Sequence, residues 1–289
     1  MPAIQPTRLK FQVTELAGTF LQPDLFIRVL KDLLEQYSDR THKPGQYGII
    51  NQSMPAFNVP TPVLRQVQVT IRPLVEQNPQ LSLALSTSLW NEPYLEFRIL
   101  AAYILGWIRV KPSQVILDCI HSWISSPVDD QVLTTLLKHG LAQLRLEEPE
   151  AVLKQAEEWL GSDRIWKKKA GLLVLESLIQ EPKFENLPAI FTLISPFLRK
   201  TPSSLRSQVA SLLITLLKRS PNESAFILQE NLRASDNPDT AWLVRHALAE
   251  LKSLTSTANQ SELSVDLHNR LRETLRQEYI SQKEKLNDL

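Results

Sequence analysis

The segment DRIWKKKA, residues 163–170, carries a dense group of basic side chains that could bind an anion. On a helix, one side would carry the cations and Gly171, and another side would carry apolar residues. The first set is Arg164, Lys167, Lys168 and Gly171, and the second is Trp166, Ala170, Leu173 and Val174. This pattern predicts a core-anchored helix that presents its basic side outward. Such clusters are more often solvated surface than binding sites.

Gly171 interrupts this helix and lowers its propensity by about 1 kcal/mol relative to Ala. Close approach of a neighbouring helix or of a phosphate backbone would compensate for it. We favour the neighbouring helix.

Other kinds of site have little support in the sequence. The histidines show no His-x-x-x-His or Cys-rich metal spacing, and no Gly-rich phosphate loop or Gly-x-Ser-x-Gly elbow occurs. We therefore predict no metal and no cofactor. Cys119 is the single cysteine and lies in the apolar run VILDCIHSW, which predicts a buried, inert thiol without a disulfide in the chain.

Composition limits what the surface can do. The net charge of the 289 residues is only +1, so a nucleic-acid surface would need unevenly placed cations. The N-terminal sequence MPAIQPTRLKF does not resemble a signal peptide, and no run of 18 apolar residues occurs. We expect a soluble, cytoplasmic protein with no membrane contact.

The elements that must position these residues are helices. Prolines number 19 and glycines 7, which favours many proline-initiated helices and few hairpins. Turn or cap residues recur roughly every 30 to 40 residues, the spacing of two-helix repeats. These helix starts follow Thr61, Asn91, Ser126, Ser162, Thr201 and Asn237, and second helices are expected over 79–89, 112–125, 149–160, 186–198 and 221–232. The fold class predicted is all-α, a solenoid of stacked antiparallel helix pairs.

The most apolar of these helices lies within WNEPYLEFRILAAYILGWIR, residues 90–109, after Pro93. Apolar residues cover most of its cylinder, which predicts a helix covered on two sides. Glu96 and Arg98 are its only charges before the end, and we interpret them as a local ion pair or capping set.

This segment also carries a resemblance to a known family. The pattern formed by Leu89, Trp90, Glu96, Arg98, Ile99, Leu100, Ala101 and Ala102 resembles the LW…E.R.LA signature of AlkD-type DNA alkylation repair proteins. The resemblance extends weakly from about Tyr47 to Leu251 and includes Gly48, Pro62 and Arg65. It implies HEAT-like repeats, with DNA bound in a concave face of the solenoid, by proteins that excise alkylated bases.

Given this resemblance, cations on successive opening helices would share one surface. Lys138, Arg164, Lys168, Arg206 and Arg245 are candidates, with Lys167 beside them. Such a row would neutralise a similar number of phosphates and give salt-sensitive, largely sequence-independent binding to duplex DNA.

The catalytic residues that the resemblance implies transfer poorly. The family places a Trp, and an Asp four residues later, near the start of the repeat that here begins at Pro127. Those positions hold Asp129 and Leu133, while Lys168 stands for a family Arg and Ser211 lies where a groove aromatic is expected. Asp130, one turn before Leu133, is the remaining catalytic candidate. We favour the interpretation that the Asp-Asp pair stabilises a helix N-terminus.

The tryptophans stand at positions that predict core anchoring, and Trp242 is the least certain. Its run, NPDTAWLVRHALAEL, resembles the last repeat of alkylation repair homologues, with Arg245 and His246 just past the Trp; packing against the following linker is the alternative. We expect an N-terminal helical pair and loop over 1–60, the repeat solenoid over 61–253, and a linker with a C-terminal capping helix over 254–289. That last helix carries Leu263, Leu267, Leu271 and Leu275 at every fourth position. A coiled-coil contact with another chain is the alternative to capping.

Two functions remain open at this point. The first is a monomeric DNA-binding protein of the alkylation repair superfamily, acting on damaged or distorted duplex, with weakened or lost glycosylase chemistry. The second is a non-enzymatic scaffold that binds a protein or peptide partner in its groove.

Overall fold

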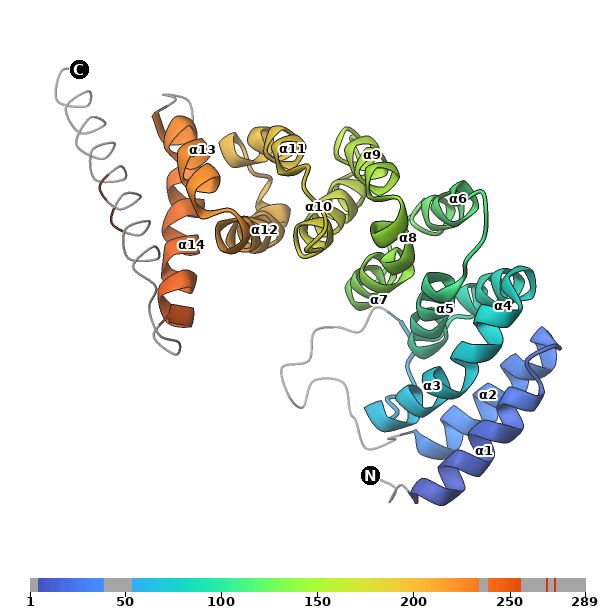
Figure 1. The fold of residues 1–289 in the computed structure, drawn as a ribbon. Coiled ribbons are helices and arrows are strands. Elements are labelled where there is room, and N and C mark those ends of the chain that lie inside the picture. The colour runs from blue at the N-terminus through green and yellow to red at the C-terminus, as the bar shows by residue number, and fades with distance from the viewer. Residues whose placement is uncertain (1–4, 39–53, 234–238, 256–268, 270–272, 274–289) are drawn as a thin grey trace, which may run out of the picture. The chain divides into compact units, whose positions relative to one another are not determined.

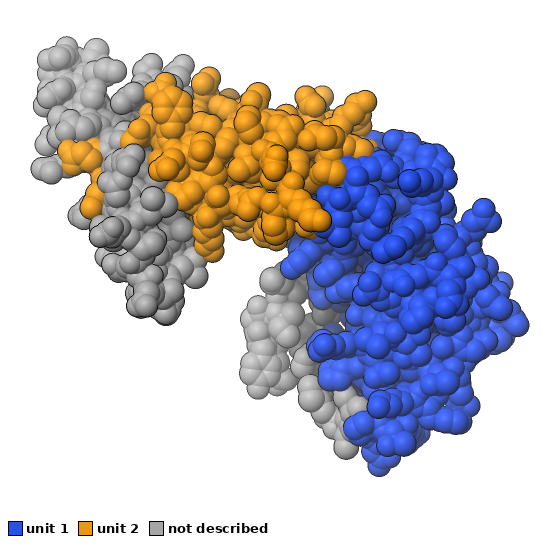
Figure 2. Space-filling view, viewed as in Figure 1, with its two compact units in different colours: residues 1–148 blue, residues 149–289 orange. Residues whose placement is uncertain are grey.

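The computed structural model describes residues 5–38, 54–233, 239–255, 269 and 273, and all regular secondary structure in these ranges is helical (Figure 1). The predicted all-α fold of stacked, HEAT-like helix pairs is confirmed. The chain divides into two compact units, Met1–Glu148 (unit 1) and Pro149–Leu289 (unit 2), shown separately coloured in Figure 2.

Unit 1 consists of helices arranged in two layers. The first layer contains α1 (Pro6–Gly18), α3 (Thr61–Gln77), α5 (Leu95–Trp107) and α7 (Asp130–Thr135), each in contact with the next. The second contains α2 (Pro23–Tyr37), α4 (Pro79–Asn91) and α6 (Gln114–Trp123). Helix α2 packs on α4, and Trp90 stacks on Trp123 at 4.3 Å to join α4 to α6. We call the first layer, formed by the helix that opens each pair, the opening layer.

Unit 2 repeats this arrangement. Its opening layer contains α10 (Ile165–Ile179), α12 (Arg206–Arg219) and α14 (Thr240–Thr255), which pack on one another in that order. Its second layer contains α9 (Pro149–Leu160), α11 (Leu187–Arg199) and α13 (Pro221–Arg233). A short 3₁₀ turn, Ser203–Leu205, precedes α12.

Helix α5 is buried along most of its length, as its apolar sequence predicts. It begins at Leu95 rather than directly after Pro93, because Tyr94 has an extended backbone. Glu96, only 4 % exposed, accepts hydrogen bonds from the backbone N–H groups of Phe57 and Asn58 at 3.1 and 2.7 Å. Glu96 thus fastens the segment before α3 to α5 through backbone hydrogen bonds, in place of the predicted ion pair or helix cap.

Arg98 completes this local set without pairing with Glu96. Its Nε donates to the carbonyl oxygen of Glu92 at 3.3 Å, and its guanidinium lies 5.3 Å from the centre of the Trp90 ring. The contact adds a cation–π interaction between α5 and the end of α4.

The pair that begins after Pro127 departs from the predicted continuous helix. Helix α7 is followed by a π-helical turn, Leu136–Gly140, and by the short helix α8 (Ala142–Glu147). The π turn packs on α5, and each of these two elements has a glycine at the contact: Gly140 in the turn and Gly106 in α5.

Gly171 confirms the prediction of a close neighbouring helix. A Cβ atom at this position would lie 2.7 Å from Cγ of Leu160 and 3.0 Å from the carbonyl oxygen of Ala156, both on α9. The side of α10 that carries Gly171 therefore packs inward, and the prediction that this whole side points outward is wrong.

Three tryptophans anchor the core as predicted: Trp90, Trp123 and Trp159 are buried. Trp107 and Trp166 are half-buried, and Trp242 is 39 % exposed.

Cys119 is half-buried rather than fully buried, and burial raises the pKa of its thiol to about 11 against the opposing effect of a hydrogen bond with Thr87. No helix among the described residues is both long and apolar enough to cross a membrane. Most of the predicted loop before Pro60, and nearly all of the predicted C-terminal helix, lie outside the described residues.

Candidate functional site

The acidic pair at the start of α7 occupies a helix N-terminus. Asp129 is the N-cap residue, and its carboxylate accepts hydrogen bonds from the backbone N–H groups of Gln131 and Val132 at 2.9 and 3.4 Å. Asp130 follows in the exposed first turn, where the helix dipole favours a negative charge. The geometry supports the helix-stabilising interpretation of both residues.

Leu133 is 3 % exposed and belongs to the core of unit 1. The position that the resemblance assigns to a catalytic carboxylate therefore does not reach the surface. The position expected to hold a groove aromatic, Ser211, is exposed on α12, and its hydroxyl donates to Glu176 of α10 at 2.7 Å.

The π turn brings its backbone unusually close to α5. A Cβ atom on Gly106 would lie 1.9 Å from the carbonyl oxygen of His139, so only glycine fits at this position. Gly140 in turn lies against Leu136 and the backbone of Ala102. Single π-helical turns inside α-helices frequently occur at functional sites.

This contact holds His139 against an aromatic surface on α5. The imidazole stacks on the Tyr103 ring at 4.4 Å between centroids, and Tyr103 lies 5.9 Å from Trp107. The guanidinium of Arg72, from α3, lies 5.9 Å from the Trp107 ring and also pairs with Glu76 at 2.9 Å. We call Arg72, Tyr103, Trp107, Lys138 and His139 the platform. Its members come from successive elements of the opening layer.

The platform is aromatic and, at neutral pH, uncharged at its centre. Burial, together with Lys138 and Arg145, lowers the pKa of His139, so the imidazole is neutral at pH 7. Burial raises the pKa of Tyr103, so its phenol is also neutral. Cationic side chains, Arg72 and the exposed Lys138, stand beside this neutral surface.

Sequence reasoning did not identify the platform. The sequence predicted that Tyr103 and Trp107 lie on an apolar helix covered on two sides, and the histidines were considered only as metal ligands; of the platform residues, Lys138 alone was proposed as a binding residue. One feature of the sequence does point to the platform. Tyr103 and Trp107 lie four residues apart in a largely aliphatic helix, and each ring carries a polar group, an O–H or an N–H. Such rings favour positions where one edge can reach a polar partner or solvent.

The cations of the segment 163–170 lie at the start of α10. Arg164 is the N-cap residue, and its guanidinium lies 5.5 Å from the Trp166 ring. Lys167 and Lys168 are half-exposed, one turn before the buried Gly171. Lys168 lines a cleft between α9 and α11, together with Glu157 and Lys200.

A second aromatic and basic group spans α12 and α14, and we call it the α12/α14 cluster: Arg206, Asp239, Trp242, Arg245 and His246. Arg206 pairs with Asp239 at 2.8 Å and lies 5.5 Å from the Trp242 ring, which stacks on His246 at 5.2 Å. Asp239 also accepts from the backbone N–H of Thr201 at 2.9 Å. Arg245 is exposed, one turn after Trp242. The contacts of Trp242 with Arg206 and His246 were not predicted.

The structure thus brings only some of the predicted cations together. Arg206 and Arg245 share the α12/α14 cluster, while Arg164, Lys167 and Lys168 form a separate group on α10. Lys138 belongs to unit 1 and to the platform. Across the described part of the chain, no group of at least three His, Cys, Asp or Glu side chains is placed to hold a metal ion.

Comparison with known protein families identifies the family of the chain. The model of the DNA alkylation repair enzyme family matches residues 30–251, from within α2 to within α14. The chain belongs to this family. The matched region includes the platform, the α10 cations and the α12/α14 cluster. No curated protein matches the chain significantly.

Proposed function

We propose that this alkylation repair family member binds duplex DNA through the opening layers of its units and recognises alkylated or distorted sites with the platform. The cations on α10 and in the α12/α14 cluster would contact phosphates, which gives affinity without sequence readout. The main support for this proposal is the platform, because it places a neutral aromatic surface next to cationic side chains.

The chemistry of an alkylated purine suits such a surface. Alkylation of a ring nitrogen makes the base cationic, and cations are attracted to the faces of Trp and Tyr rings. Stacking on aromatic side chains also tolerates any base, because each base has a π face. A neutral His139 adds to this surface, whereas a protonated one would repel a cationic base.

We further propose that glycosylase chemistry is weakened. Cleavage of the N-glycosidic bond develops positive charge on the sugar, which a carboxylate stabilises. The position expected to supply that carboxylate holds buried Leu133. Asp130 remains the candidate if the chain retains activity.

A gel-shift titration of the full chain on plain and methylated duplex tests the binding proposal. We expect Tyr103→Ala to raise the Kd for methylated duplex by about tenfold, in line with the loss of one stacked base. Phe226→Ala, which removes an exposed ring from the second layer of unit 2, is the control and should leave the Kd unchanged.

The same samples test the alternatives. If the chain binds neither duplex at low salt, the DNA-binding proposal fails and a protein-interaction scaffold becomes the better account. A base-release assay on methylated DNA tests the chemistry separately: rapid release of alkylpurines would contradict weakened catalysis while leaving DNA binding intact.

A further inference from the structure

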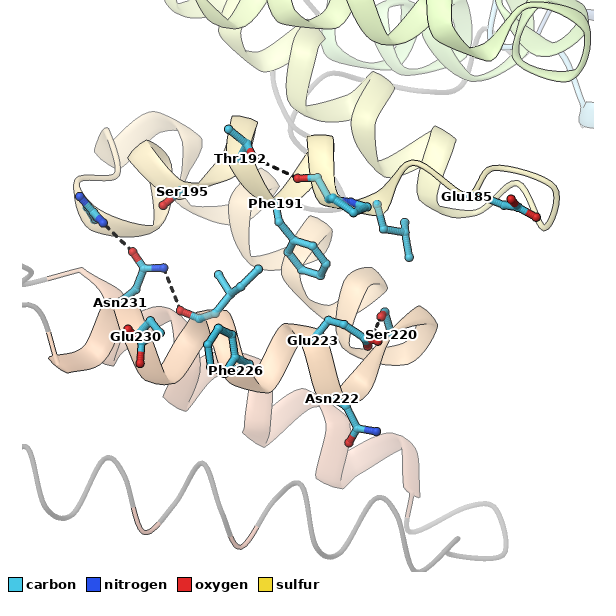
Figure 3. Close-up of a pocket in the computed structure, with 14 residues that line it drawn as sticks. Glu185, Phe191, Thr192, Ser195, Ser220, Asn222, Glu223, Phe226, Glu230 and Asn231 are labelled. Atoms are coloured by element: carbon cyan, nitrogen blue, oxygen red, sulfur yellow. Dashed lines mark hydrogen bonds between the residues drawn. The ribbon is translucent and has the colours of Figure 1, made fainter.

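The second layer of unit 2 contains an apolar groove that the proposed DNA contacts do not use. It lies between α11 and α13 and has a volume of about 950 Å³ (Figure 3). Its lining includes Phe191, Phe226 and Ile227, and Figure 3 shows Phe191 directed from α11 toward α13. Phe226 is 63 % exposed, an unusual position for a ring of this size.

The lining residues follow helical spacing on both sides of the groove. Helix α11 contributes a stripe from Pro188 to Arg199, and α13 contributes a stripe from Asn222 to Asn231. At 1.5 Å per residue, the α11 stripe is about 16 Å long, which is about three helical turns. A helix lying along the groove would meet both stripes through side chains at i, i+3 or i+4, and i+7.

The polar groups in the groove are largely engaged already. Arg199 Nε donates to Asn231 Oδ1 at 3.1 Å, and Asn231 Nδ2 donates to the carbonyl oxygen of Ile227 at 2.8 Å. Ser220 donates to Glu223 at the other end. A helix satisfies its own backbone hydrogen bonds and presents only side chains, whereas an extended peptide needs partners for its backbone, so the engaged polar groups favour a helix.

The charge of the groove selects the kind of helix. Glu185, Glu223 and Glu230 line its edges, and Arg199 is the only basic residue in the lining. This acidic balance disfavours phosphate groups and favours lysine or arginine side chains.

We propose that the α11/α13 groove binds a basic amphipathic helix from a partner protein. The apolar residues of that helix would pack on Phe191 and Phe226, and its cations would face the glutamates. This binding uses Phe191, Phe226 and the glutamates of the groove, none of which takes part in the proposed DNA contacts.

Fluorescence anisotropy with a synthetic helical peptide of roughly 15 residues tests the proposal on the full chain. The peptide carries Leu at i, i+3 or i+4, and i+7, and Lys at the flanking positions. A control peptide of the same length carries Glu in place of each Lys. We expect the basic peptide to bind about tenfold more tightly than the acidic control peptide. Glu185→Lys combined with Glu230→Lys should reduce or reverse this preference.

Phe226→Ala should raise the Kd of the basic peptide by about tenfold, since it removes the exposed anchor of the groove. Phe11→Ala is the matched control, because Phe11 on α1 is 64 % exposed and lies outside the groove. Circular dichroism verifies that each variant keeps its helical content.

Equal binding of the basic and acidic peptides, or equal effects of Phe226→Ala and Phe11→Ala, would overturn the proposal. A concentration-dependent dimer in sedimentation that Phe226→Ala abolishes would also overturn it, since a second copy would then be the occupant. Neither result changes the gel-shift outcome for DNA, so the two proposals can fail independently.

Discussion

Leu133 and Asp129 stand where the resemblance places reactive side chains, yet both stabilise unit 1. Leu133 packs in the core, and Asp129 is the N-cap of α7, the helix that contains Leu133. Local contacts therefore explain this segment without catalysis.

A substitution that seems to restore the family pattern should instead destabilise the fold. Leu133→Asp would bury a carboxylate without a partner, so we expect the free energy of unfolding to fall by roughly 3 kcal/mol or more. Asp129→Ala should lower it by about 1 kcal/mol through loss of the cap. Urea denaturation measures both values, and a stable Leu133→Asp variant with increased base release would contradict our placement of this residue.

At the residue scale, the sequence predicted burial better than exposure. The anchoring of Trp90 and Trp159 and the packing of Gly171 against a neighbouring helix followed from pattern and chemistry. Tyr103 and His139 were missed, because their stacking depends on a contact between residues far apart in the chain. Periodicity within one helix contains no information on such a contact.

At the scale of elements, the contact between α5 and the π turn controls the platform. Gly106→Ala places a methyl group where the His139 carbonyl lies, and these elements must separate to accept it. We expect the free energy of unfolding to fall by about 1–3 kcal/mol and the Tyr103–His139 stack to loosen, weakening binding to methylated duplex. Thermal unfolding and gel shifts measure these effects.

Gly18→Ala is the matched control for this experiment. Gly18 ends α1, and a Cβ atom there would meet nothing within 4 Å. This variant should be neutral or slightly more stable, since Ala has the higher helix propensity. If both variants behave alike, the close contact at Gly106 has no energetic importance.

Helix starts were the most predictable elements. Helices α3, α4, α9 and α13 begin where proline and cap residues indicated. The break of the Pro127 helix into α7, a π turn and α8 was not predicted, because it accommodates the backbone of α5 rather than a local sequence preference. The solenoid-like stacking followed from repeat spacing, whereas the division into compact units did not.

At the scale of the whole molecule, DNA binding should depend on cations carried by the opening helices of unit 2. We expect charge reversal at Lys167, Lys168, Arg206 and Arg245 to abolish duplex binding at low salt. Smaller subsets of these reversals should flatten the dependence of log K on log salt by about 0.9 for each phosphate that the protein no longer neutralises. Gel shifts across salt concentrations measure both quantities.

The control reverses the same number of exposed cations outside the opening helices: Arg28, Lys111, Lys154 and Lys183. Net charge then changes equally in both variants, so a difference between them reports position rather than bulk charge. Equal reductions in binding would show that the opening layer has no special role.

The half-buried Cys119 has a consequence for the chemical reactivity of the chain. Because burial raises the pKa of its thiol to about 11, the reactive thiolate is scarce at physiological pH. The only sulfhydryl of the chain is therefore a poor nucleophile, and thiol-directed reagents should modify it slowly at neutral pH.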